Sequence, residues 1–358
     1  MSTSVDQARL TDTMSQVEQL AVVQVGVDLK LFRILVEDPS KQWDISSLAV
    51  RAGAEASLLA RLLRYLRAFG LLQQLESGSY QANATACWLA TPGAEGGVKH
   101  YFTTVNKICS ALPEFLAKSG YRNPTSSIDC AFNMAFGTDK PAYGWKPDDP
   151  SVLTAFTAFM KAQRAGQRSW MDLFPVQSLR LSDEDWQRDR VLFVDVGGSA
   201  GHQCIALREQ YPELDGQIVL QDQEAVIARL DHAHLDGLKM SATVHDFFAP
   251  QPVTGAKAYY LRNIMHDWPD DACVRILAHL RDALAEDSVI LIDEMVLPDT
   301  GASWKQAQKD IQMMAGLAAM ERTESQWARL LERTGLRKDC VWCYDKTMGD
   351  SIVVAVPK

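Results

Sequence analysis

The segment Val191-Leu-Phe-Val-Asp-Val-Gly-Gly-Ser-Ala-Gly201 decides the fold of this chain. It begins with a short apolar run, typical of a buried strand in a parallel sheet, and ends in a glycine-rich turn before a helical segment. Similar apolar runs occur at 218–220, 258–261 and 289–292, again with helical segments between them. Strands that alternate with helices predict a Rossmann-like α/β domain, with a doubly wound, mostly parallel sheet covered on both faces.

The glycine-rich turn after the first strand is the first candidate binding site. Gly197, Gly198 and Gly201 lie at the carboxyl end of the strand, where glycine lets the backbone approach a ligand closely. The spacing D-x-G-x-x-x-G differs from the G-x-G-x-x-G pattern of dinucleotide sites. Asp195, just before the turn, would repel a pyrophosphate and instead suits a ligand with a positive group, such as the amino group of a methionine moiety.

A second acid follows the second strand. Asp222 comes about 20 residues after the turn, the position from which an acid binds ribose hydroxyls in α/β nucleotide sites. It can also cap the next helix, and the two roles are compatible. Together, the turn and Asp222 favour a cofactor that contains a nucleoside.

A histidine and two carboxylates follow later strands. His266 lies between the apolar run 258–261 and a helix that Pro269 opens. Glu294 follows the next strand, at the same edge of the sheet, and Glu321 lies at a loop-to-helix junction. A lone histidine here can be purely structural, but a histidine oriented by carboxylates is what a general base needs.

In combination, these segments resemble the small-molecule O-methyltransferases of fungal and plant secondary metabolism, which use S-adenosylmethionine (SAM). The resemblance runs from about residue 15 to 356 and is carried by Asp195-Val-Gly-Gly-Ser-Ala-Gly201, Leu220-Gln-Asp222, Tyr259-Tyr-Leu-Arg-Asn-Ile-Met-His-Asp-Trp-Pro269, Glu321-Arg-Thr-Glu324 and Phe136-Gly-Thr-Asp-Lys-Pro141. It implies a class I methyltransferase domain at 111–358. A winged-helix dimerisation domain at 1–110 precedes it, and 111–175 form a helical linker that contributes to the acceptor pocket.

The resemblance implies how SAM would be held. The glycine turn would wrap its methionine part, and Asp222 would bind its ribose. Asp246 and Phe247 match the family's acid-plus-apolar pair around the adenine, and Arg262 stands where the family often has Lys near the cofactor. The family's middle turn residue is often Gly. Here it is Ser199, which fits if its backbone angles are ordinary.

The resemblance also implies a mechanism. His266 matches the catalytic base, Glu294 and Glu321 match the carboxylates beside it, and Asp267 follows the base as usual in the family. A phenol or enol with a pKa near ~10 is mostly protonated at neutral pH. The base would remove that proton as the oxygen attacks the methyl group of SAM.

The acceptor pocket is expected to be apolar. Phe159 and Met160 match family positions that line it. Further aromatic and methionine side chains favour a flat apolar acceptor, an aromatic or polyketide-type metabolite: Trp145, Met313 and Met314. Most other aromatic residues of 98–175, Tyr143 among them, are interpreted as helical core.

Some relatives in fungal pyridone pathways bind SAM but catalyse dehydration and pericyclic cyclisation. His100 resembles a histidine that those cyclases use, although it can equally be a structural residue at the domain junction. In one such cyclase the base position carries Arg and the first flanking acid is Asp. His266 and Glu294 therefore favour methyl transfer in this chain.

The N-terminal part predicts three helices and a hairpin. Asp44 is a plausible helix N-cap, a helix begins at 57, and a short hairpin pairs 71–75 with 80–83. This is the outline of a winged helix, which often binds DNA. The helix 57–66 is too apolar for a single narrow face, so we expect a dimerisation surface and a homodimer instead.

The composition of the chain limits its possible binding partners and its cellular compartment. The chain has 358 residues, with 36 Lys and Arg against 45 Asp and Glu, a net charge of −9. An acidic chain is poorly suited to nucleic acid, which also weighs against a winged-helix regulator without enzyme activity. No apolar run reaches the ~18 residues of a membrane span. A polar N-terminus and seven scattered cysteines predict a cytoplasmic protein with reduced thiols, and no metal site is expected.

Overall fold

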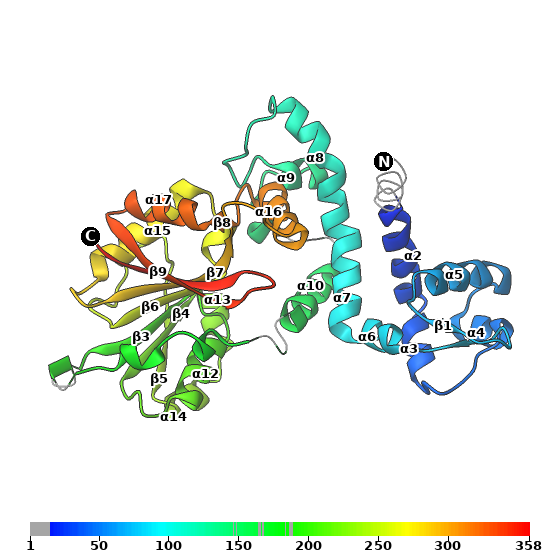
Figure 1. The fold of residues 1–358 in the computed structure, drawn as a ribbon, viewed down its shortest axis with the longest axis horizontal. Helices are drawn as coiled ribbons and strands as arrows, with labels where there is room; N and C mark the ends of the chain where they lie inside the picture. Colours follow the sequence, from blue (N-terminus) through cyan, green and yellow to red (C-terminus); the bar gives the residue numbers. More distant parts are fainter. Residues whose placement is uncertain are drawn as a thin grey trace. The chain divides into compact units, whose positions relative to one another are not determined.

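The computed structural model describes residues 15–145, 147, 149–163, 166, 168–182, 184–185 and 189–358. The chain divides into two compact units (Figure 1). The first comprises Met1–Ser110 and Trp145–Gln167, and the second Ala111–Gly144 and Arg168–Lys358. The segment 111–175 is expected to belong as a whole to the C-terminal domain, but 145–167 fall in the first unit.

The second unit is built on one eight-stranded sheet. Its strand order is β5-β4-β3-β6-β7-β10-β9, with β8 beside β7. The pairs from β5 to β7 are parallel, and β10 is antiparallel to both of its neighbours. The strands are β3 (Val191–Val196), β4 (Gln217–Asp222), β5 (Met240–Val244), β6 (Ala258–Arg262), β7 (Val289–Leu297), β8 (Arg322–Thr323), β9 (Leu336–Asp345) and β10 (Asp350–Pro357). This confirms the expected doubly wound, mostly parallel sheet.

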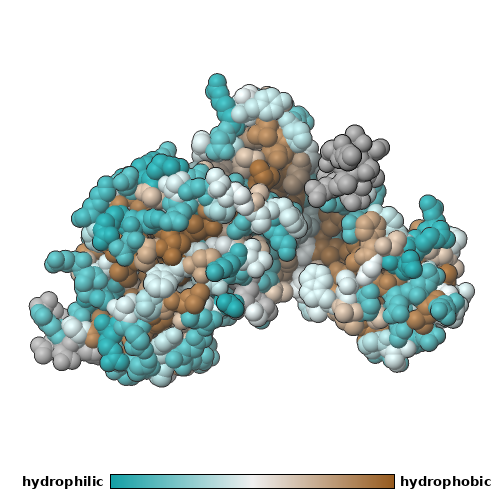
Figure 2. Space-filling view, in the orientation of Figure 1, coloured by the Kyte–Doolittle hydropathy of each residue, from teal (hydrophilic) through white to brown (hydrophobic). Residues whose placement is uncertain are grey.

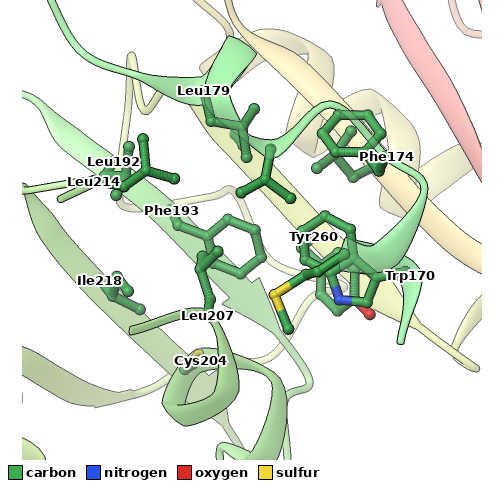
Figure 3. Close-up of a cluster of buried hydrophobic side chains, with 14 of the residues drawn as sticks. Trp170, Phe174, Leu179, Leu192, Phe193, Cys204, Leu207, Leu214, Ile218 and Tyr260 are labelled. Atoms are coloured by element: carbon green, nitrogen blue, oxygen red, sulfur yellow. The ribbon is translucent and has the colours of Figure 1, made fainter. Parts of the chain in front are cut away.

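The central strands are mostly apolar because both faces of the sheet are buried. Phe193 and Tyr260 belong to the core on one face, while the next residue of β3, Val194, and Tyr259 of β6 belong to the core on the other. Figure 3 shows the first of these cores, where the Trp170 ring stacks on Phe193 with centroids 6.3 Å apart. Each such buried side chain contributes ~1.5–3 kcal/mol relative to exposure.

Helices cover both faces of this sheet. Cys204 and Leu207 of α12 pack into the Trp170 core, and residues of α15 and α17 pack into the opposite core. The helices of the second unit are α9 (Ala131–Phe136), η2 (Ala142–Gly144), η3 (Trp170–Asp172), η4 (Val176–Leu179), α12 (His202–Gln210), α13 (Glu224–Ile227), α14 (His232–Gly237), η5 (Met265–Asp267), α15 (Asp270–Ala283), α16 (Trp304–Leu317) and α17 (Glu324–Glu332).

The first unit is mostly helical, as expected. Asp44 caps α4 by accepting a hydrogen bond from the Ser47 N–H at 2.9 Å, and the predicted hairpin is present as β1 and β2. The elements are α2 (Gln16–Asp28), α3 (Leu31–Val36), α4 (Ile45–Ala52), α5 (Ala56–Ala68), β1 (Gln73–Gln74), β2 (Tyr80–Gln81), α6 (Ala84–Leu89), α7 (Pro92–His100), the π-helix η1 (Tyr101–Val105) and α10 (Pro150–Gln163). α8 (Asn106–Lys118) crosses the division between the units.

Glycines explain why 145–167 join the first unit. A Cβ at Gly93 would lie 2.1 Å from the Ala162 Cβ, and one at Gly96 would lie 2.4 Å from the Ala155 carbonyl oxygen. α10 therefore approaches α7 more closely than side chains there would allow. Among the described residues, no helix has the length and apolar character needed to cross a bilayer. In the view of Figure 2, hydrophilic residues lie over much of the surface of the second unit.

Candidate functional site

The glycine turn after β3 has no room for side chains at two positions. Gly197 has a φ of +71°, and a Cβ there would lie 2.8 Å from Ile264 Cδ1. At Gly198, a Cβ would lie 2.4 Å from Leu220 Cδ1 and 2.5 Å from the Asp195 carboxylate. Glycine at both positions therefore lets the turn pack closely against these neighbours. The N–H groups of Gly197 and Gly198 both donate to the Gln221 carbonyl oxygen, at 2.8 and 3.1 Å.

Asp195 lies beneath this turn. Its carboxyl group is buried, and the Cys204 thiol donates to its Oδ2 at 3.2 Å. Burial raises the pKa of Asp195 to about 7, because the charged form loses its hydration. The predicted contact between this carboxylate and an amino group remains a prediction.

Asp222 fixes the shape of the turn. Its Oδ2 accepts a hydrogen bond from the Ser199 N–H at 2.8 Å, and its Oδ1 accepts one from the Gln223 N–H at 2.7 Å. Ser199 has a φ of 55°, in the left-handed region, so the condition of ordinary backbone angles is not met. The hydrogen bond from its N–H to Asp222 helps to hold a conformation that serine otherwise rarely adopts.

Two further cofactor candidates lie after β5. Gly197 and Phe247 are close, since a Cβ on the glycine would lie 3.7 Å from Phe247 Cε1. The Phe247 ring also meets the Trp268 ring edge-on, with centroids 6.1 Å apart. Asp246, the preceding residue, accepts a hydrogen bond from the Phe248 N–H at 2.9 Å. The structure thus brings Phe247 to the glycine turn.

Arg262, at the end of β6, belongs to a buried polar cluster. Its Nε lies 3.3 Å from Asp293 Oδ2, and the Tyr344 hydroxyl donates to Asp293 Oδ1 at 2.6 Å. The Tyr260 hydroxyl donates to the same carboxylate. Burial lowers the pKa of Arg262, but Asp293, Tyr260, Tyr344 and Asp350 together outweigh it, and the pKa rises. Sequence reasoning missed Asp293 and the two tyrosines, because they lie in apolar strand patterns.

His266 meets three carboxylates. It lies on the 3₁₀ turn η5, with Nδ1 at 3.1 Å from Glu321 Oε1 and 3.3 Å from Glu294 Oε2. Its Nε2 lies 3.3 Å from Asp267 Oδ1. Glu294 and Glu321 are only 1% and 3% exposed. The structure therefore brings the predicted base, both flanking acids and Asp267 together in one cluster.

Two buried side chains hold this turn through hydrogen bonds to its backbone. Glu294 Oε1 accepts the N–H groups of Ile264 at 2.9 Å and Met265 at 2.7 Å. The buried Arg322 guanidinium donates to the carbonyl oxygens of Met265 at 2.9 Å and Trp268 at 3.0 Å. These hydrogen bonds thus restrict the conformation of the backbone that carries the imidazole.

The three carboxylates control the charge of the imidazole. Burial by itself lowers the pKa of His266, but the negative charges of Glu294, Asp267 and Glu321 raise it to about 10. Burial raises the pKa of Glu294 to about 7. In the ligand-free chain the imidazole is therefore protonated at neutral pH. The ligand atoms of His266, Glu294 and Glu321 lie within 4.8 Å of one another, a spacing compatible with a metal ion, but the imidazolium already supplies a positive charge there.

Tyr143 is a member of this cluster that sequence reasoning missed. Its hydroxyl, on η2, donates to Asp267 Oδ2 at 2.6 Å. The residue is not core, since its side chain is 64% exposed. The available signal was its place just after the turn 136–141, in a segment already included in the resemblance.

The predicted acceptor residues are divided between the units. Met313, on α16, and Asp267 belong to the second unit. In the first unit, the His100 ring lies 5.0 Å from the Phe156 ring and 5.9 Å from the Phe159 ring, centroid to centroid. Met160 follows on α10, and Trp145 begins the second segment of that unit. Their part in acceptor binding remains a prediction.

Comparisons with known proteins match nearly the whole chain. The profile of the O-methyltransferase domain matches residues 119–337, and that of the O-methyltransferase dimerisation domain matches 13–92. A demethylsterigmatocystin 6-O-methyltransferase of Aspergillus parasiticus is 38% identical over 340 residues, which cover 95% of this chain and 86% of that protein.

Solved structures give the same match. The structure of LepI in complex with SAM is 32% identical and has a TM-score of 0.89, covering 100% of this chain and 90% of that one. A structure described as a pericyclic reaction enzyme, also 32% identical with the same coverage, has a TM-score of 0.88.

Proposed function

This chain belongs to the O-methyltransferase family, and from that premise we propose that it methylates a phenolic or enolic hydroxyl of an aromatic or polyketide-type metabolite, with His266 as general base. The observation that supports this most is the position of the imidazole. His266 follows β6 at the edge of the sheet that also carries the glycine turn, and its Nδ1 is oriented by two buried glutamates.

The residues around the turn fit SAM. The closely packed glycine turn is the expected place for the methionine moiety, Phe247 lies beside it with an apolar face for a base, and Asp222 stands where a ribose-binding acid is expected. When bound, SAM supplies a methyl group activated by a sulfonium.

The protein's own part in the reaction is proton removal. Glu321 and Glu294 keep the Nδ1 proton of His266, which directs its Nε2 toward the acceptor. Nε2 must first lose its own proton and then accept that of the hydroxyl. Imidazolium releases a proton more readily when another positive charge is bound nearby, because like charges lower its pKa. The sulfonium of bound SAM would supply such a charge.

We also propose a homodimer formed through the N-terminal part, 1–110. The match to a dimerisation domain at 13–92 supports it. Exposed apolar side chains in the same unit, such as Trp88 at 63% and Val17 at 63%, are compatible with a partner surface. Light scattering on the whole chain tests this, and a monomer at micromolar concentration would exclude it.

The proposed reaction is tested with SAM and a panel of phenols and enols. We expect S-adenosylhomocysteine and a methylated product. His266→Gln retains SAM binding by calorimetry and loses ~10²–10⁴-fold in turnover. The control is His234→Gln, an exposed histidine on α14. Unchanged methylation by the His266 variant would contradict the proposed base.

A second candidate function is a SAM-bound pericyclase or dehydratase. Its support is the likeness to the pericyclic reaction enzyme and the protonated state of the ligand-free imidazole, which suits an acid. Product analysis separates the two functions. A cyclised product without release of S-adenosylhomocysteine would favour this second candidate.

A further inference from the structure

The contact between Tyr143 and Asp267 links two distant segments of the second unit. The Tyr143 hydroxyl donates to Asp267 Oδ2 at 2.6 Å, while the other oxygen of the same carboxylate lies 3.3 Å from His266 Nε2. The two residues are 124 positions apart in the chain. The phenol therefore has the closer contact with Asp267, and the imidazole has the longer one.

This geometry divides the charge of one carboxylate between two partners. A charge-assisted hydrogen bond from a phenol to a carboxylate is strong, and it holds the carboxylate in one rotamer. A carboxylate bound in this way is a weaker partner for a second N–H. Without the phenol, this hydrogen bond no longer holds Oδ2, and the contact between Asp267 and Nε2 can shorten.

We propose that Tyr143 is a positioning residue of the active site, which holds Asp267 so that the Nε2 edge of His266 remains available to the acceptor hydroxyl. This role rests on the proposed methyl transfer. Tyr143 acts through Asp267, not by contact with the reacting atoms.

Other groups around the imidazole also affect its pKa. Glu294 faces Nδ1 from β7, and Glu321 faces it from the segment before β8. Asp310 of α16 accepts the Glu321 N–H at 3.1 Å. These contacts are on the Nδ1 side, and the phenol donates its hydrogen bond to Asp267 and not to these groups. Tyr143→Phe therefore changes the Nε2 side and leaves the Nδ1 contacts in place.

The first test is a titration of the His266 imidazole by NMR on isotopically labelled whole chain, with His266→Gln to assign its signal. We expect Tyr143→Phe to raise the imidazole pKa by ~0.5–1 unit. Tyr121→Phe, which removes a hydroxyl from a tyrosine that is 79% exposed in the same unit, leaves it unchanged. SAM titration shows that each variant is folded.

The second test uses activity and a double-mutant cycle. The acid limb of the kcat profile moves to higher pH in Tyr143→Phe, so that turnover below that limb falls ~3–10-fold. In an Asp267→Asn background, Tyr143→Phe has no further effect, because the phenol acts through that carboxylate. A purely structural role would lower turnover equally at every pH.

Failure of this proposal and failure of the proposed function give different results. An unmoved imidazole pKa in Tyr143→Phe, or effects of the two substitutions that simply add, would overturn the proposal. If the wild-type chain methylates no acceptor, the proposed function fails. The NMR titration still decides the role of Tyr143 in that case, because it needs no turnover.

Discussion

Replacing Arg322 by Met tests whether the turn that carries His266 depends on a buried cation. The Arg322 side chain is 0% exposed, and it donates to the carbonyl oxygens of Met265 and Trp268 and to the Asp270 carboxylate at 2.8 Å. Methionine fills much of the volume but donates no hydrogen bond. The substitution therefore weakens the hydrogen bonding of two carbonyl groups in the turn.

The size of the effect follows from these partners. A buried polar group left without a partner costs ~1–3 kcal/mol. The Cys273 thiol can donate its one proton to either carbonyl group, at 3.2 or 3.3 Å, and the Met265 oxygen also accepts the Trp268 N–H at 3.3 Å, so the lower half of that range applies to each. The ion pair adds little, because Asp270 is 44% exposed. We expect a loss of ~2–4 kcal/mol in the free energy of unfolding.

Urea unfolding of the whole chain, followed by fluorescence, measures this loss. Arg333→Met is the matched control. Its side chain is 46% exposed and pairs with the exposed Asp271, so we expect less than ~1 kcal/mol. Equal losses in the two variants would refute the argument that the buried guanidinium stabilises the turn.

Three further predictions concern the cofactor, pH and metal. Gly198→Ala weakens SAM binding by at least ~10-fold in calorimetry, because its methyl group would collide with Leu220 and Asp195. The control is Gly237→Ala, since nothing lies within 4 Å of a Cβ at that position. Equal affinities in the two variants would contradict the prediction that the glycine turn binds SAM. The folded pKa of His266, about 10, lies above its ordinary value, so its contribution to stability is complete below pH ~6.5 and is lost as pH rises to about 10. Urea midpoints of the wild type therefore fall more steeply over that range than those of His266→Gln, and parallel slopes would show that the imidazole does not hold its proton. EDTA treatment leaves turnover intact, and activity that returns only with added metal would disprove the metal-independent site.

Much of the sheet and the family could be predicted from the sequence. Apolar runs at 191–194 and 258–261 need both faces buried, and acids or glycines directly after such runs must lie at one sheet edge. This rule predicts that His266 and Glu294 lie at the same edge, and His266 Nδ1 does lie 3.3 Å from Glu294 Oε2. The family membership inferred from the same motifs is confirmed by the matching profiles.

The remaining features depend on contacts that periodicity does not encode. Tyr143 is 124 residues away from Asp267, and nothing in its own neighbourhood indicates a carboxylate partner. The steric need for glycine at positions 93 and 96 arises only because α10 lies against α7. The left-handed Ser199 was missed for the same reason, since its hydrogen bond comes from an acid on the next strand.

The hydrogen bond between Asp222 and the Ser199 N–H has a consequence for how a ligand is received. An acid on β4 sets the conformation of the turn after β3, so the turn is already shaped before anything binds. A preorganised loop loses little conformational freedom when a ligand binds, so its affinity depends mainly on the contacts with that ligand. We expect the ligand-free turn to show high amide order parameters, comparable to those of the strands beside it.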